Sequence, residues 1–372
     1  MDGKTLEIRQ NEKDLDPFLN LPFSIYRGDP YWVPPVKKDV RDILGPGNPF
    51  WNHSKKIIFT AYRDGAAAGR IAGIIDDNHI EFHQEKAGFF GFFESINDYS
   101  VAEALLNSVK KWLRENGMEI MRGPVNPSTN EDCGFLLEGF GSAPFIMMTY
   151  NPAYYLDFME RYGLLKAKDL FAWLMPVENG PVMRLEKLSS RIRNKFPQLV
   201  VRPLEKKKFD EEIDAIMDIY NGAWEKNWGF VPMTEDEMRH LGKKLKPIVE
   251  PGLLQLAFFD KEPAGFLMAL PDFNQALKLL HGKMTPLGIL KLLYYAPKIR
   301  TARLLTLGVK EKFRKHGIDA LLYHNSLKYA LEKGYKWCEF SWILEDNVLT
   351  NRAAGTMGGK LYKKYRIYET KI

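Results

Sequence analysis

The chain has 372 residues, of which 45% are hydrophobic and 27% charged, which is the composition of an ordinary globular protein and excludes a disordered one. This length is large for one hydrophobic core and suits two domains of common size. The net charge of +6 favours an anionic partner, either nucleic acid, a phosphate-rich cofactor or an acidic membrane surface. Because the sequence has no zinc-finger cysteine pairs and no aromatic RNA-binding signature, nucleic acid is not the expected partner.

The amino terminus and the cysteines favour a cytoplasmic protein. Residues 1–16 are polar and mixed in charge, unlike an export signal, and no apolar run is long enough to cross a bilayer. Two cysteines, Cys133 and Cys338, do not predict a disulfide framework. Cys338 lies in the strand-like segment WCEFSWI, so a buried structural thiol is expected there rather than a nucleophile.

The first half alternates short strands with helices. Its turn at Asp64-Gly65 is a strong hairpin signal, and apolar residues at helical spacing precede Gly117, which is placed to end a helix. The predicted elements are a strand at 6–9, proline-broken helices within 14–44, a hairpin over 56–76, a strand at 87–95, a helix at 101–116 and a strand at 118–123.

The second half repeats this order. Ala61-Tyr62 aligns with Ala257-Phe258 without a gap, and the matching residues continue to Asp76 and Asp272. The predicted elements are a strand at 199–204, helices at 209–228 and 235–245, a hairpin over 253–270, a strand at 303–309, a helix at 318–333, a strand at 336–343, a short helix at 347–357 and a strand at 362–369. The repeat predicts domains at 1–178 and 196–372, joined by a linker at 179–195 with its own helix.

A basic turn at 310–316 precedes Gly317, and the next helix is expected to begin at Ile318. A helix amino terminus offers unpaired N–H groups and a positive dipole end, and a glycine there lets an anion approach the backbone. The turn is therefore either a phosphate-binding site or an ordinary solvated turn. The first half has Ser100 in place of this glycine and no basic residues before it.

A strand ending in Leu-Gly-Val, then R-x-x-G, a helix, a strand and a later asparagine and glycine resemble the GCN5-related N-acetyltransferase (GNAT) superfamily. In that family, R/Q-x-x-G-x-G/A wraps the pyrophosphate of coenzyme A, and the preceding strand holds the pantetheine arm. The resemblance implies an α/β (α+β) fold with two tandem GNAT-like domains, each a mixed, mostly antiparallel sheet flanked by helices. It assigns pantetheine to Leu307, Gly308 and Val309, pyrophosphate to Arg314, Lys315, His316, Gly317 and Ile318, and a structural or cofactor contact to Asn347.

The resemblance implies a degenerate first domain and a second domain that carries the acyl-CoA site. Asp319 stands where the family has a second small residue, and Ala354 stands where it often has the tyrosine that protonates the thiolate. Tyr362, Tyr365 and Tyr368, on a tyrosine-rich strand, are candidates to replace that tyrosine, and half-buried sheet residues are the alternative. Glu339, and Glu345 with Asp346, are candidates for the base that deprotonates an amine acceptor, and a solvated charge or a helix cap is the alternative for each.

The segment 220–237 gathers amides and aromatic side chains where the family lines its acceptor site. The candidate acceptor residues are Asn221, Trp224, Asn227 and Trp228, and a loop anchored by tryptophans is the alternative. His316 and His324 lack partners at metal-ligand spacing, so no metal is predicted.

Residues 273–300 are rich in leucine with interspersed lysines, which predicts either a helical lid or peripheral contact with the inner face of a membrane. The predicted function is transfer of an acyl group, acetyl or longer, from a coenzyme A thioester to a small-molecule or lipid amine. The alternative is a non-catalytic GNAT scaffold that binds acyl-CoA or a partner.

Overall fold

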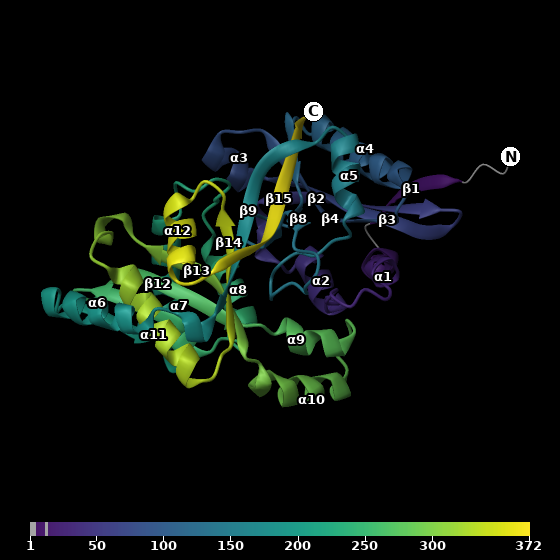
Figure 1. The fold of residues 1–372 in the computed structure, drawn as a ribbon. Helices are drawn as coiled ribbons and strands as arrows, with labels where there is room; N and C mark the ends of the chain where they lie inside the picture. The colour runs from purple at the N-terminus through teal and green to yellow at the C-terminus, as the bar shows by residue number, and fades with distance from the viewer. Residues whose placement is uncertain (1–4, 12–13) are drawn as a thin grey trace. The chain divides into compact units, whose positions relative to one another are not determined.

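The computed structural model describes residues 5–11 and 14–372 (Figure 1). Two compact units are present. The first contains the described residues up to Leu170 together with Leu277–Leu292 and Lys363–Ile372, and the second contains Phe171–Ala276 and Leu293–Tyr362. These units divide the chain differently from the predicted boundaries at 178 and 196, because β9 (Leu165–Pro176) and β15 (Lys360–Lys371) each contribute residues to both units. The boundaries at 178 and 196 were predicted from the sequence repeat, and they stay a prediction.

The first unit is built on a mixed sheet in which β1, β2, β3, β4, β5 and β15 are successive neighbours. Its pairings are antiparallel except for β4 with β5, which are parallel and joined by the helix α4. The elements are β1 (Leu6–Gln10), α1 (Asp16–Ile25), α2 (Lys37–Leu44), β2 (Ser54–Arg63), β3 (Ala66–Asp76), α3 (Asp77–His83), β4 (Ala87–Ser95), α4 (Tyr99–Glu115), β5 (Ile120–Gly123), β6 (Val125–Asn126), β7 (Asp132–Cys133), β8 (Phe135–Glu138) and α5 (Tyr154–Arg161).

The helix α4 buries the face that its sequence periodicity predicts. Val101, Leu105 and Val109 are fully buried and pack in one core with strand residues such as Ile71. Burial of this apolar stripe, rather than intrinsic helix propensity, supplies most of the stability of such a helix.

The second unit repeats the arrangement, with β14, β13, β12, β11 and β10 as successive neighbours. Among the described pairings of these five strands, β13 and β14 pair in parallel and are connected by α11, and the others are antiparallel, so the predicted fold of each half is confirmed. The elements are α6 (Val182–Lys195), β10 (Leu199–Pro203), α7 (Phe209–Ala223), α8 (Glu235–Leu245), β11 (Leu254–Phe259), β12 (Glu262–Pro271), α9 (Asn274–Leu277), α10 (Pro286–Tyr295), β13 (Thr301–Val309), α11 (Ile318–Glu332), β14 (Trp337–Leu344) and α12 (Val348–Thr356).

Alternate residues of β12 face α7 and α11. Phe266 packs against Trp224, which follows α7, whereas Leu267 shares a cavity with Leu327 of α11. The predicted helix at 209–228 ends earlier, at Ala223, and Gly229 with a positive φ lies in the loop that follows. Among the described residues neither cysteine forms a disulfide, and no helix is long and apolar enough to cross a membrane.

Candidate functional site

The parallel strands β13 and β14 pair over a short stretch. Their register joins residues 301–304 to residues 337–340, so residues 305–309 continue beyond the last paired position. On its other edge β13 remains paired with β12 as far as Val309, with an irregularity near Leu304. The backbone of Leu307, Gly308 and Val309 therefore lies on a strand that separates from its parallel neighbour, which is the geometry that a pantetheine-binding strand requires.

Trp224 lies directly on this strand. A Cβ added at Gly308 would overlap the Trp224 ring, so the glycine allows the indole to approach the backbone. The ring also packs against Tyr220 and Phe266, at centroid distances of 5.0 and 5.7 Å. The fold thus brings a predicted acceptor residue and the predicted cofactor strand into contact.

The other predicted acceptor residues lie at or just after the end of α7. Asn221 donates from Nδ2 to the carbonyl oxygen of Met233 at 3.3 Å, while its buried Oδ1 accepts no hydrogen bond within the described structure. The backbone carbonyl of Asn227 accepts from the N–H of Phe230 and stabilises the turn that contains Trp228. Asn227 thus has a turn-forming role in the backbone, and an acceptor role for these residues stays a prediction.

The basic turn is held by its own side chains. Arg314 donates to the carbonyl oxygens of Val309 (3.3 Å) and Ala223 (3.1 Å), which ties the turn to the ends of β13 and α7. Lys310 forms ion pairs with Asp218 (2.5 Å) and Glu262 (3.5 Å). Of the cations predicted to bind pyrophosphate, Arg314 and Lys315 are both exposed.

His316 faces inward at this turn. Its Nδ1 lies 3.0 Å from the carbonyl oxygen of Phe313, and its ring packs edge-on against Phe196 and Phe259. These contacts give His316 a packing role, and a contact with pyrophosphate stays a prediction.

The amino terminus of α11 has no capping side chain. Gly317 occupies the cap position with φ +76°, and a Cβ there would press on Ile192 of α6. The first-turn N–H groups beginning at Ile318 thus have no side-chain acceptor at the cap. Asp319 is exposed in this first turn, where the helix dipole favours a carboxylate.

The equivalent helix of the first unit carries its own anion. Asp98 caps α4, accepts from the N–H of Ser100 at 3.0 Å, and pairs with Arg63 at 2.6 Å. Burial alone would raise the pKa of Asp98, but the hydrogen bonds from Ser100 and the Arg63 guanidinium hold it below its usual value. A carboxylate of the chain therefore takes the position that a phosphate would need.

In the first unit, residues 125–126 lie against the strand β4, which corresponds to β13. A Cβ added at Gly91 of β4 would overlap the carbonyl oxygen of Val125, and Asn126 Oδ1 accepts from the N–H of Phe92 at 2.5 Å. Asn126 thus bonds to the strand of the first unit that corresponds to β13, and Val125 lies close against it. In the first unit, internal groups thus occupy the positions of both features of the candidate cofactor site, and its assignment as a degenerate copy stays a prediction.

Glu339 is fully buried in a polar cluster of the second unit. Its carboxylate accepts hydrogen bonds from the hydroxyls of Ser341 and Tyr362, and Arg303 Nε lies 3.9 Å away. Arg303 also donates to Ser341 Oγ at 2.8 Å. Neither Arg303 nor Ser341 was predicted from the sequence as a site residue. The two-residue period of β14 places Ser341 on the face of Glu339, whereas Arg303 requires knowledge of the β13 register.

The remaining predicted site residues lie elsewhere. Tyr365 is fully buried in the first unit, where it pairs with Leu136 of β8, so the tyrosine that contacts Glu339 is Tyr362. Glu345 is half-buried just after β14. Asn347 caps α12 by accepting from the N–H of Thr350 at 3.1 Å, which gives it a structural role.

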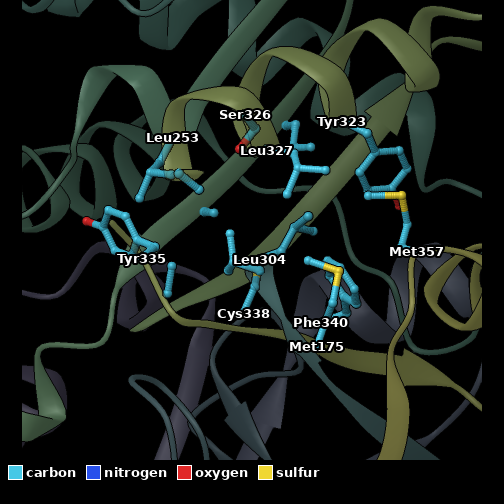
Figure 2. A pocket seen from close by; sticks show the side chains of 15 residues that line it. Met175, Leu253, Leu304, Tyr323, Ser326, Leu327, Tyr335, Cys338, Phe340 and Met357 are labelled. Atoms are coloured by element: carbon cyan, nitrogen blue, oxygen red, sulfur yellow. The ribbon is translucent and has the colours of Figure 1, made fainter. Parts of the chain in front are cut away.

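An apolar cavity of about 30 Å³ lies between α11 and the sheet of the second unit (Figure 2). Figure 2 shows Tyr323 and Leu327 of α11 over Leu304, Cys338 and Phe340 of the strands. Burial raises the pKa of the Cys338 thiol to about 12, so it stays protonated, as expected of a structural thiol. The volume suits about two water molecules and is too small for a long acyl chain.

A polar cavity of about 80 Å³ in the first unit was not predicted. Glu94, whose side chain is 12% exposed, accepts from the hydroxyls of Tyr26 (2.9 Å) and Tyr155 (2.8 Å), and lies 3.5 Å from Arg70. Burial raises the pKa of Glu94. No group of three or more histidine, cysteine, aspartate or glutamate residues in the described ranges is placed to hold a metal ion.

Solved structures define the class of this fold. A tandem GNAT protein from the clavulanic acid biosynthesis pathway superimposes with a TM-score of 0.60 at 12% identity, over 99% of this chain and 98% of that one. The fold is therefore that of the tandem GNAT proteins. No family model matches the sequence.

Two relatives match along nearly the whole chain. Protein YghO of Escherichia coli (strain K12) is 34% identical over 97% of this chain and 94% of its own length. The bacterial ceramide synthase of Caulobacter vibrioides is 34% identical over 96% of this chain and 94% of its own length. The chain belongs to the family of these two proteins, which is a family of GNAT-fold acyltransferases.

Proposed function

We propose that the protein is an N-acyltransferase that uses a coenzyme A thioester as acyl donor. The observation that supports this most is the uncapped amino terminus of α11 beside the end of β13, with exposed Arg314 and Lys315 in the turn between them. Unpaired N–H groups and nearby cations suit a pyrophosphate, and a strand that separates from its neighbour suits an extended pantetheine arm. In the first unit, Asn126 bonds to the corresponding strand and Asp98 caps the corresponding helix.

In the proposed reaction, the amine nitrogen attacks the thioester carbonyl carbon, the C–S bond breaks, and the products are an amide and coenzyme A. The amine must lose one proton and the leaving thiolate must gain one. Glu339 is the proposed acceptor of the amine proton. Because its oxygens bond to the hydroxyls of Ser341 and Tyr362, the proton would reach it through one of these hydroxyls.

The acceptor that we propose is a long-chain amino alcohol, and the donor a long-chain acyl-CoA. One relative is named a bacterial ceramide synthase, and a ceramide is the amide of a fatty acid with such an amino alcohol. The half-buried rings of Trp224 and Trp228 would give the chain-bearing amine an apolar contact next to β13. A short-chain amine would use little of this apolar surface.

The decisive test is product formation by the purified protein with palmitoyl-CoA and sphinganine, followed by mass spectrometry of the amide and assay of free thiol. We expect Glu339→Gln to lower kcat by roughly 100-fold or more, as for loss of a general base. The matched control Glu332→Gln changes an exposed carboxylate of α11 and is expected to retain activity. Thermal unfolding of both variants checks that they fold.

Full activity of Glu339→Gln would contradict the proposed role of this carboxylate. Thermal stabilisation by palmitoyl-CoA without transfer to any amine would instead favour the non-catalytic scaffold. If neither acetyl-CoA nor palmitoyl-CoA binds, the donor site itself is wrongly assigned.

A further inference from the structure

The helix α10 is apolar on nearly every side and remains exposed. Leu287, Leu290, Leu293 and Tyr294 keep 65%, 63%, 65% and 61% of their surface accessible. A helix of a soluble domain normally buries its apolar residues, and Gly288 is the buried residue of this one. Met284, Ile289 and Tyr295 are exposed beside them. So large an apolar surface marks a contact site.

The segment before α10 is firmly attached to the first unit. The carbonyl oxygen of Gly282 accepts from the N–H of Lys37 at 3.1 Å, and the Lys278 ammonium donates to the carbonyl oxygen of Pro30. A Cβ at Gly282 would overlap the Phe23 ring, so the chain packs closely there. The exposed leucines therefore belong to a helix with an ordered attachment.

The charged residues in the segment of chain that contains α10 have one sign. No aspartate or glutamate occurs from residue 273 to residue 310, whereas Lys278, Lys283, Lys291 and Lys298 surround or lie within the helix. The Lys298 ammonium sits 3.4 Å from the centre of the Tyr294 ring. Apolar side chains with lysines and tyrosines at their margin match the interface of an anionic bilayer, where the rings lie at headgroup depth.

We propose that α10 (Pro286–Tyr295) docks the protein on a membrane surface that contains anionic lipid. Leu287, Leu290 and Leu293 enter the boundary between headgroups and acyl chains, and Lys283 and Lys291 contact lipid phosphates. This contact would be peripheral and reversible, because one short helix inserts only to the depth of the interface. It does not depend on the proposed acyltransferase activity.

The test is flotation of the full-length protein with phosphatidylcholine vesicles, either pure or containing roughly one third phosphatidylglycerol. We expect binding to the anionic vesicles, weak or no binding to the pure ones, and release as the salt concentration rises. No substrate is present, so the result is independent of catalysis.

The variant Leu290→Glu/Leu293→Glu is expected to raise the lipid concentration for half-maximal binding roughly tenfold or more. Leu165→Glu changes a leucine that is 71% exposed on β9 and is expected to bind as the wild type does. Lys283→Gln/Lys291→Gln, which leaves the apolar surface intact, is expected to weaken binding to anionic vesicles alone.

Three results would overturn the proposal. The first is no binding of the wild type to anionic vesicles, and the second is equal binding of the wild type and the double glutamate variant. The third is a dimer in solution that the double glutamate variant dissociates, without vesicle binding, since α10 would then join two copies of the chain.

Discussion

The residues that cap the two repeated helices differ in whether they supply a side-chain acceptor. Asp98 caps α4 with a carboxylate, whereas Gly317 occupies the cap position of α11 without any side-chain acceptor. The buried residues of α4 are all apolar, whereas those of α11 include His324 and Ser326. At the scale of residues, the capacity to receive an external anion therefore depends on whether the chain supplies an anion of its own.

Removal of the internal anion should cost stability. Asp98→Ala is expected to lower the free energy of unfolding by about 1 kcal/mol, the usual cost of losing such a cap. Because the pKa of Asp98 is lowered by folding, its contribution is present above the unfolded pKa and is lost as the pH falls through the folded pKa. Denaturant unfolding at neutral and acidic pH measures both effects.

The control for Asp98 is Ser100→Ala, which keeps the backbone N–H that Asp98 accepts from and removes only the hydroxyl. It should cost less than Asp98→Ala. Equal stability of Asp98→Ala and the wild type at neutral pH would show that the cap contributes nothing.

His79 should account for part of the decrease in the free energy of unfolding at acidic pH. Burial lowers its pKa to about 4, opposed in part by Glu85 at 3.4 Å, so the unfolded chain takes up a proton at this residue while the folded chain stays neutral. Stability from His79 is present above pH about 6.5 and is lost as the pH falls towards about 4, by up to about 3 kcal/mol.

The variant His79→Phe keeps a flat ring and cannot titrate. A plot of unfolding free energy against pH should therefore be shallower for the variant than for the wild type between pH about 6.5 and about 4. Parallel curves in that window would assign the acid sensitivity to other groups. The nearby ionisable groups are His83, Glu85, Arg122 and Asp76.

At the scale of elements, the sequence predicts what local signals encode. The hairpin turn at Asp64-Gly65 and the buried face of α4 follow from turn chemistry and a 3.6-residue period, and both occur in the structure. The helix predicted at 209–228 was too long, because the apolar residues Trp224 and Trp228 continue the pattern past the point where α7 ends.

Contacts between residues that are far apart in the sequence could not be predicted from local patterns. Arg303 reaches the Glu339 cluster because β13 pairs with β14 in a register that no local pattern fixes. In the same way, Val125 lies against Gly91 although the two residues are 34 positions apart in the sequence. The hydrogen bond between Asn126 and Phe92 joins residues with the same separation. The candidate cofactor turn was predictable because it lies in one continuous segment, whereas the partners of Glu339 come from separate strands.

At the scale of the whole molecule, the chain contains two copies of one fold, and they differ at the strand and the helix start that form the candidate cofactor site. The second copy keeps the separated strands and the uncapped helix, and the first fills both positions with Asn126 and Asp98. A polar cavity lined by Arg70 and Glu94 occurs in the first copy and an apolar one in the second.

This difference between the copies predicts which segments coenzyme A will protect from amide hydrogen exchange. The protection can be measured by mass spectrometry. Addition of coenzyme A should slow amide exchange at 305–322, because the pantetheine arm would cover the β13 backbone and the pyrophosphate would accept from the first-turn N–H groups of α11. Segment 91–106 of the first copy should exchange at an unchanged rate, since Asn126 and Asp98 already hold its corresponding N–H groups. Pantetheine, which lacks the phosphates, is the matched control and should protect 305–309 with little effect on 318–322. Equal protection of both copies, or protection of 91–106 alone, would contradict the division of roles between them.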